Sequence, residues 1–187
     1  MRSAREWLVR LPSAYLSSDL LRSRHAAFLA EQRILRIFVD ADACPVKDEV
    51  YRVAARYGAS VAVVANAFLR VPRDPAIELV VVAEGPDVAD DWIAERAGPG
   101  DVVVTADIPL ADRALRAGAQ AVSPTGKPFT ASNIGGALAG RAVGEHLRSI
   151  GETTRGPAPF TPADRSRFLQ ALDAAMGRAR RDAAGRP

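Results

Sequence analysis

Aspartates that directly follow strand-like segments are the residues of this sequence best suited to chemistry. Asp40 and Asp42 follow one β-rich run, and Asp107 follows another, in the triplet Thr105-Ala106-Asp107. An Asp-Ala-Asp sequence at the end of a strand has no evident need of both acids for capping a helix. The carboxyl ends of parallel strands meet at one edge of a sheet, where open α/β sheets bind their ligands. We therefore expect these carboxylates to form a functional site.

A third loop contributes further carboxylates at the same edge. Asp87 follows a third β-rich run, and Asp90 and Asp91 lie in the next helical turn. Asp87 by itself is predicted to be the N-cap of that helix, because short acidic side chains accept hydrogen bonds from the first helical amides. Crowded like charges repel one another, and Mg²⁺ or Mn²⁺, which suit carboxylate oxygens, would relieve the repulsion. A cation held there lowers the pKa of a bound water and clamps a phosphate.

The acid pair Asp40 and Asp42 also admits a second chemistry. In phosphatases with an aspartate nucleophile, the first acid attacks phosphorus and the second transfers the proton. Such a site also needs a phosphate-binding lysine and a hydroxyl side chain after a later strand, which Thr105 would supply. The two lysines of the chain, Lys47 and Lys127, are poorly placed by their spacing. We therefore prefer the metal site and keep the phosphatase as an alternative.

Cations and one thiol accompany these acids in the sequence. Lys47 and Arg70 are candidates for binding phosphate, although each is as readily a solvated surface group. Thr105 is expected to help position phosphate as well. Cys44, the single cysteine, is predicted to be a small buried residue, because no histidine that could activate it lies nearby in the sequence. One cysteine cannot form an internal disulfide, so a reducing, cytoplasmic location is expected.

Short apolar runs alternate regularly with amphipathic segments and must position these side chains. The apolar runs are rich in Val and Ile, which is typical of strands buried on both faces. The predicted strands are residues 34–39, 60–65, 77–82, 102–105 and 119–122. The predicted helices are residues 45–57, 87–97, 109–117, 134–150 and 161–180. Residues 123–130 are expected to form a loop. The alternation favours a three-layer α/β fold, α-β-α, around a mostly parallel sheet.

Composition bounds the class of protein. Of 187 residues, 48% are hydrophobic and 25% are charged, which is ordinary for one globular domain with appendages. We expect an N-terminal extension over residues 1–33, helical or disordered, a single domain over 34–181 and a basic tail over 182–187. The net charge of +3 comes from arginine-rich ends, which we interpret as solvated tails rather than a nucleic-acid surface. No uncharged apolar stretch is long enough to span a membrane, so no membrane partner is expected.

Four blocks of the sequence resemble the uncharacterised bacterial YaiI/YqxD family. They are Phe38–Lys47, Ala65-Asn66 with Leu69–Pro72, Asp87–Asp91 and Gly100–Ala111. The first and the last are long and specific, and the resemblance covers residues 35–172. The family usually begins at the first strand, so residues 1–33 fall outside it. Pro86 stands where an aromatic residue is expected, but this change removes no carboxylate.

The resemblance implies a PIN-like fold and, as in PIN domains, an Mg²⁺-dependent nuclease that uses clustered acids. The acids that it implies here are Asp40, Asp42, Asp87, Asp91 and Asp107. We expect Mg²⁺- or Mn²⁺-dependent hydrolysis of phosphodiesters, with RNA as the partner. Asp40 and Asp107 would bind the metal, while Asp42 and Asp91 would complete its shell or orient the attacking water. A PIN-like module that binds RNA and regulates without catalysis is the alternative.

Overall fold

The computed structural model describes residues 35–41, 44–149 and 160–184. The chain divides into two units, and the described residues all belong to the second, Ile34–Pro187. Residues 1–33, the predicted extension, and Asp42 of the predicted site lie outside the described residues. No described helix is both long and apolar enough to cross a membrane.

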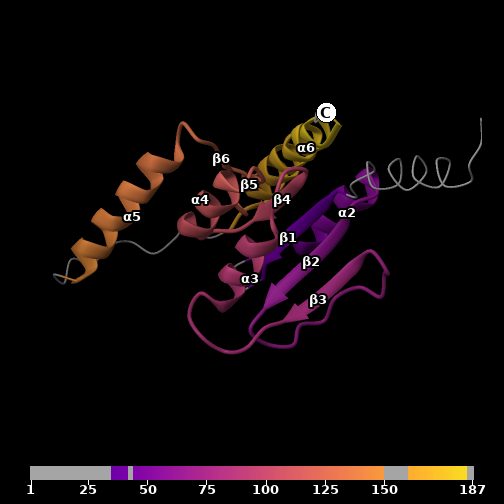
Figure 1. Ribbon diagram of the computed structural model, residues 1–187, viewed down its shortest axis with the longest axis horizontal. Helices are drawn as coiled ribbons and strands as arrows, with labels where there is room; N and C mark the ends of the chain where they lie inside the picture. The colour runs from indigo at the N-terminus through magenta and orange to yellow at the C-terminus, as the bar shows by residue number, and fades with distance from the viewer. Residues whose placement is uncertain (1–34, 42–43, 150–159, 185–187) are drawn as a thin grey trace, which may run out of the picture. The chain divides into compact units, whose positions relative to one another are not determined.

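In the described part of the chain, six strands form one sheet (Figure 1). They are β1 (Arg36–Asp40), β2 (Ser60–Ala65), β3 (Ile77–Val81), β4 (Asp101–Val104), β5 (Gln120–Val122) and β6 (Pro128–Phe129). Their order across the sheet is β3-β2-β1-β4-β5-β6. The first five strands pair in parallel, and β6 runs antiparallel to β5. The strand order reverses between β1 and β4, so their carboxyl ends flank the crevice in which open α/β sheets bind ligands.

Strand β1 is buried on both faces because its central side chains are all apolar. Ile37, Phe38 and Val39 have no exposed surface. Alternate side chains of a strand point to opposite faces of the sheet. Ile37 and Val39 accordingly pack in one hydrophobic core and Phe38 in the other. Burial of each such side chain contributes about 1.5–3 kcal/mol, so the two cores together hold β1 in register.

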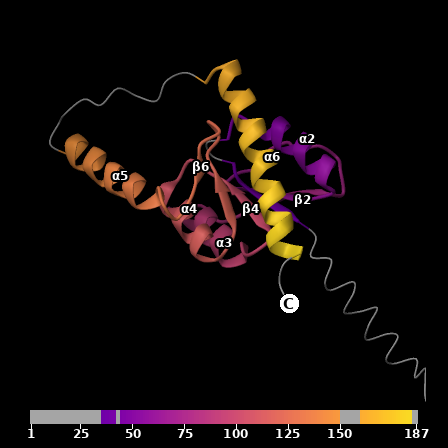
Figure 2. The same cartoon turned by 90° about the horizontal axis from the view of Figure 1, so that it is seen from above.

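Helices cover both faces of the sheet. They are α2 (Lys47–Tyr57), α3 (Val88–Arg96), α4 (Ile108–Arg116), α5 (Ile134–Ser149) and α6 (Pro162–Ala184). Helices α2 and α6 lie on one face, and α3 and α4 lie on the other (Figure 2). Helix α5 packs mainly against α4. The predicted α/β class, with three layers around a mostly parallel sheet, is therefore confirmed.

Two local predictions at the end of the chain were wrong. Residues 128–129, predicted to lie in a loop, form β6 because a tight turn precedes them. In that turn, the Ser123 amide donates to the Lys127 carbonyl oxygen at 2.9 Å and starts the antiparallel pairing. The last helix extends to Ala184, beyond its predicted end, and Asp182 there accepts a hydrogen bond from the Gln120 side chain at 3.0 Å.

Candidate functional site

Asp40 lies at the carboxyl end of β1, beside the end of β4, and is buried. The hydroxyl of Thr105, the residue after β4, donates to Asp40 Oδ2 at 2.8 Å. The same Thr105 Oγ1 accepts a hydrogen bond from the Asp107 amide at 2.9 Å. One buried hydroxyl therefore ties the carboxylate of β1 to the loop that carries the next acid. Thr105 was predicted to bind substrate, and these contacts add a role in positioning Asp40.

Asp107 is the N-cap of α4, and both of its carboxylate oxygens have partners. Oδ1 accepts a hydrogen bond from the Leu110 amide at 2.9 Å. Oδ2 forms an ion pair with Arg141 Nη1 at 2.6 Å. Arg141 belongs to α5, 34 residues further along the chain, and nothing in the local sequence connects it to Asp107. A metal ion at Asp107 would therefore compete with a guanidinium.

The acids of α3 point in different directions. Ala89 and Ile93 are buried and set the rotation of the helix about its axis. Successive residues of an α-helix lie about 100° apart, so Asp91 is on the side away from Ala89. Asp91 is exposed there and forms an ion pair with Arg113 of α4, at 2.7 Å between Oδ1 and Nη1. Asp91, assigned to the site from the sequence, thus has a cationic partner at the surface.

Asp90 is the acid of α3 whose pKa is affected by Asp40 and Asp107. Its side chain is half-buried. Burial, followed by the charges of Asp40, Asp107 and Asp87, raises the pKa of Asp90 from an ordinary 3.8 to about 6, while Arg113 acts in the opposite direction. Like charges raise a carboxyl pKa only when they lie close together, and a divalent cation relieves that crowding. Asp90 is thus a stronger candidate than Asp91.

Asp87 precedes α3 in a left-handed backbone conformation. Its φ of 61° is the only positive one among the described residues other than glycine. Asp87 is the N-cap residue of α3, as predicted, but its side chain does not make the expected N-cap hydrogen bond. The backbone is the reason, since an N-cap residue normally adopts an extended conformation. Asp87 is exposed, and its charge contributes to the raised pKa of Asp90.

Asn66 adds a buried oxygen at the same edge of the sheet. It directly follows β2, the neighbour of β1, and its Oδ1 is buried without a hydrogen-bond partner among the described residues. A buried acceptor without a partner costs about 1–3 kcal/mol, so a donor or a cation at this oxygen would be stabilising. The sequence already indicated a polar side chain at this edge, because the amide Asn66 follows an almost entirely apolar strand.

Lys47 lies near the acids, and Cys44 lies beside it. The Lys47 Nζ donates to the Cys44 carbonyl oxygen at 3.0 Å. Burial raises the pKa of the Cys44 thiol to about 11, against the lowering effects of a backbone hydrogen bond from Val46 and of the Lys47 charge; Asp40 raises it further. Cys44 is buried, as predicted. A thiol with so high a pKa is not a nucleophile at neutral pH.

Arg70 lies apart from the acids. It is exposed in the connection between β2 and β3, where it lines a hollow of about 640 Å³ with Phe68, Arg73 and Leu79. Among the described residues no hydrogen bond or ion pair links Arg70 to the acids. Asp42 lies outside the described residues, so its assignment stays a prediction.

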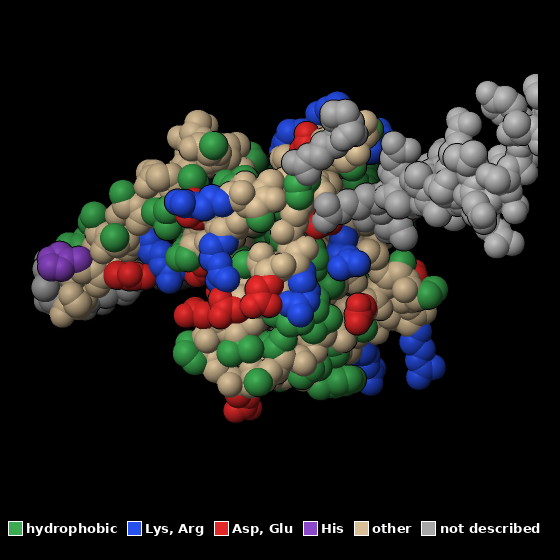
Figure 3. Space-filling view, viewed as in Figure 1, with side chains coloured by type: hydrophobic (Ala, Val, Ile, Leu, Met, Phe, Trp, Pro, Cys, Tyr) green, Lys and Arg blue, Asp and Glu red, His purple; other side chains and the backbone are tan. Residues whose placement is uncertain are grey.

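Oxygen donors of the kind that Mg²⁺ and Mn²⁺ prefer gather at this edge. Figure 3 shows acidic side chains gathered over α3, next to basic ones. Within residues 35–41, 44–149 and 160–184, no group of three or more His, Cys, Asp or Glu side chains could hold a metal ion. Mg²⁺ usually binds through one or two carboxylates and completes its shell with waters and substrate phosphates. The donor set therefore fits such a cation in the presence of a phosphate and does not form a closed metal cage.

The fold and this edge define an open α/β protein with grouped carboxylates where the strand order reverses. Within that class, the chain belongs to the family described as "Uncharacterized BCR, YaiI/YqxD family", whose model matches residues 38–178. The resemblance seen in the four sequence blocks is therefore confirmed.

Curated relatives of the chain carry the name "UPF0178 protein". One from Caulobacter sp. (strain K31) is 67% identical over 145 residues, which are 78% of this chain and 96% of the relative. One from Caulobacter vibrioides (strain NA1000 / CB15N) is 64% identical over 150 residues, 80% of this chain and 98% of the relative. One from Rhodopseudomonas palustris (strain BisB18) is 60% identical over 146 residues, 78% of this chain and 94% of the relative. No solved structure matches the chain.

Proposed function

We propose that this protein is a divalent-metal-dependent nuclease that hydrolyses RNA phosphodiesters on a PIN-like fold in the cytoplasm. The observation that carries the proposal is the Thr105 hydroxyl that links the buried Asp40 carboxylate to the loop of Asp107, with Asp90 near enough for both charges to add to the effect of burial on its pKa. Asp40 is the last residue of β1, Asp90 lies in the first turn of α3, and Asp107 lies between β4 and α4, at the edge where parallel sheets bind ligands. Repulsion between these carboxylates is unfavourable without a cation, and a bound cation would relieve it.

Asp40 and Asp107 would hold the metal together with a substrate phosphate, with Asp42 next to them as the sequence predicts, and Asp90 would complete the shell through a bound water. When bound, Mg²⁺ or Mn²⁺ supplies a water of lowered pKa and positive charge at the phosphate oxygens. Thr105 keeps the Asp40 carboxylate oriented through its 2.8 Å hydrogen bond. Asp90 takes the place in the shell that the sequence analysis gave to Asp91, because Asp91 is paired with an arginine at the surface.

Two cations of this chain would bind the substrate phosphate beside the metal. Lys47 lies at the start of α2, near the end of β1. The Arg141 guanidinium is held at the acid group by its ion pair with Asp107. A metal ion that takes over Asp107 would release this guanidinium to a phosphate oxygen, for which its paired N–H donors are suited.

Cleavage of RNA by the full chain tests the proposal. A labelled single-stranded RNA is incubated with the protein and millimolar Mg²⁺ or Mn²⁺, with and without EDTA. We expect cleavage that requires the metal and disappears in Asp40→Asn. Asp48→Asn is the matched control, because Asp48 is an exposed acid in the first turn of α2. A wild type that is inactive with both metals, or an Asp40→Asn variant that cleaves as fast as wild type, would contradict the proposal.

An RNA-binding module without catalytic activity is the second candidate. The ion pair between Asp107 and Arg141 favours it, because a carboxylate neutralised by a guanidinium has less need of a metal. Such a module would bind RNA in EDTA, its affinity would fall steeply with salt, and neither metal would yield product. Measuring binding and cleavage on the same RNA separates the two candidates.

A further inference from the structure

A cavity of about 520 Å³ lies beyond the end of β5, on the same edge of the sheet as the acid group. Its walls are largely apolar and include Ile108, Pro124, Phe129 and Phe160, while Lys127 lines it with a charged side chain. A volume of this size is ordinary for a pocket that binds a small ligand or one part of a larger one. Neither the sequence motifs nor the proposed chemistry assigns a role to this cavity.

The turn that forms one wall of the cavity is tightly held. Ser123 Oγ lies 2.9 Å from Thr125 Oγ1 and accepts a hydrogen bond from the Lys127 amide at 3.1 Å. Gly126 has a φ of 82°, and a Cβ on it would lie 2.5 Å from the backbone carbon of Arg167 in α6. Only glycine therefore lets the turn lie directly against that helix. The wall is a defined part of the fold.

The cavity is contiguous with the acid group. Ala106 and Ile108, which flank Asp107 in the chain, both line it. On α5, Ala137 lines the cavity, and Arg141, one helical turn further, forms the ion pair with Asp107. Residues four apart in a helix share one face, so the same face of α5 borders both the cavity and the acids. A ligand that fills the cavity thus lies beside the proposed cleavage site.

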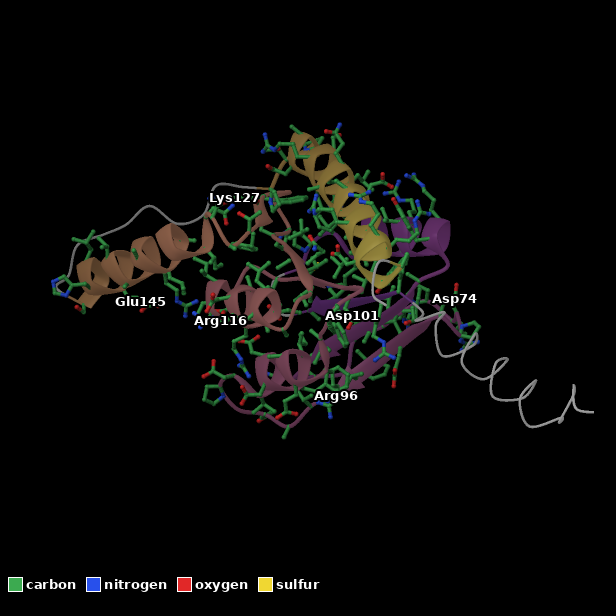
Figure 4. All side chains as sticks on the ribbon, turned by 45° about the horizontal axis from the view of Figure 1, so that its top comes forward. Asp74, Arg96, Asp101, Arg116, Lys127 and Glu145 are labelled. Atoms are coloured by element: carbon green, nitrogen blue, oxygen red, sulfur yellow. The ribbon has the colours of Figure 1, made fainter. Side chains whose placement is uncertain are left out.

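The chemistry of the cavity suits a nucleobase with its phosphate. Among the aromatic side chains of the cavity, Phe160 offers a surface for a base of any identity, while Phe129 is buried and closes the wall. The Phe160 ring is half-buried, and the Arg165 guanidinium carbon lies 5.2 Å from its centroid. Lys127 is exposed between the first turns of α5 and α6 (Figure 4), and no described carboxylate pairs with it. An apolar slot with a cation at its rim matches a base and the phosphate next to it.

We propose that this cavity binds one unpaired base of single-stranded RNA and that Lys127 pairs with the adjoining phosphate. The position of the cleaved bond beside that base rests on the proposed nuclease function, while base binding itself does not. A base can enter the cavity only when it has left its stack, so single-stranded RNA is the substrate class and duplex RNA is excluded from this site.

Equilibrium binding in EDTA tests the proposal without cleavage. The probe is a fluorescent single-stranded RNA oligonucleotide at low salt, measured by anisotropy with the full chain. Ala137→Leu adds side-chain volume inside the cavity and is expected to weaken binding at least tenfold. Ala139→Leu, the same change at an exposed position of the same helix, is expected to stay within twofold of wild type. The same oligonucleotide annealed to its complement is expected to bind at least tenfold more weakly than the single strand.

A second pair of variants keeps the test decisive if Ala137→Leu fails to fold, which circular dichroism would reveal. Phe160→Leu removes a ring from the cavity and is expected to weaken binding about tenfold, the range measured for base stacking on aromatic side chains. Phe68→Leu is its control, because Phe68 is 81% exposed and lines a different hollow.

The outcomes separate this inference from the proposed nuclease function. Base binding would be contradicted if Ala137→Leu and Ala139→Leu bind single-stranded RNA with equal affinity. It would also be contradicted if the wild type binds single-stranded and duplex RNA equally well, even if it cleaves RNA. The expected binding pattern with no cleavage would uphold base binding and contradict the nuclease. An apolar dye provides a further control. If Ala137→Leu blocks binding of the dye and single-stranded RNA does not displace it, the cavity binds an apolar ligand and the inference is wrong.

Discussion

The two ends of the central strands each hold a buried aspartate, in opposite surroundings. Asp101, at the amino end of β4, is 3% exposed, and its Oδ2 accepts a hydrogen bond from the Gly98 amide at 2.9 Å. Asp40, at the carboxyl end of β1, is 9% exposed, is linked through the Thr105 hydroxyl to the loop of Asp107, and adds to the effect of burial on the pKa of Asp90. Hydrogen bonds from amides stabilise an ionised carboxylate, whereas neighbouring carboxylates destabilise it.

The comparison shows that burial alone does not mark a functional acid. Asp101 closes the turn that leads into β4, so its charge has a structural use at that place. At the opposite edge, burial and then the charges of Asp40, Asp107 and Asp87 raise the pKa of Asp90. Unfavourable electrostatics in a folded protein indicate a site arranged for a ligand of the opposite charge.

Substitution of the two buried acids is expected to separate their roles in activity and in stability. Asp40→Asn should lower RNA cleavage about a thousandfold, because metal-assisted stabilisation of the transition state is worth several kcal/mol. Its unfolding midpoint should change little. Asp101→Ala should leave cleavage within a fewfold of wild type but reduce the free energy of unfolding by about 1–3 kcal/mol, since the buried Gly98 amide loses its acceptor. Initial cleavage rates and urea unfolding of both variants measure these two effects. Loss of cleavage in a folded Asp101→Ala variant would contradict a purely structural role for Asp101.

The neighbouring acids Asp90 and Asp91 of α3 are expected to differ in their effect on cleavage. Asp90→Asn should lower metal-dependent cleavage about a hundredfold, whereas Asp91→Asn should lower it less than about threefold. The reason is the rotation of α3, which leaves Asp91 in an exposed ion pair worth about 0–1 kcal/mol. Rates at saturating Mn²⁺ measure the difference. If Asp91→Asn is the inactive variant, the assignment from the family motif is right and the geometric one is wrong.

The raised pKa of Asp90 predicts how stability depends on pH at this edge. Between its ordinary value of 3.8 and about 6, Asp90 binds more protons in the folded than in the unfolded chain, so its contribution to stability is lost as pH rises through that window. Asp90→Asn should therefore be more stable than wild type at pH 7 by about 1 kcal/mol, after allowance for solvent screening, and equally stable near pH 4. Urea unfolding of both proteins without metal at the two pH values measures this difference, and a constant offset would contradict it.

Arg141 gives the smallest expected effect. Arg141→Ala removes the guanidinium that pairs with Asp107, so Mn²⁺ should bind about two- to fivefold more tightly, in keeping with the strength of an exposed ion pair. Arg116→Ala is the matched control, because Arg116 pairs with Asp112 within α4. Isothermal calorimetry on both variants measures the change. Unaltered Mn²⁺ affinity in Arg141→Ala would mean that the metal does not bind Asp107.

Much of the fold could be predicted because local patterns specify it. The apolar run Ser60–Ala65 forms β2 with the predicted bounds. Gly58 ends α2, as predicted, with a φ of 61° that glycine adopts without strain. Strand β6 could not be predicted in this way. It exists only because the turn before it folds back on β5, a pairing that involves residues too few to show a pattern.

Local sequence specifies which strand ends carry acids, because Asp40 ends β1 and because Thr105 and Asp107 follow β4, in an α/β alternation that sets the direction of the strands. Which of the later acids joins them depends on tertiary packing. The difference between Asp90 and Asp91 is a rotation of about 100°, set by the packing of Ala89 and Ile93. Tertiary packing also brings Arg141 to Asp107 and places the turn at Gly126 so that it closes a cavity beside them. Contacts between segments distant in the chain depend on how helices pack on the sheet, and no local pattern records that packing.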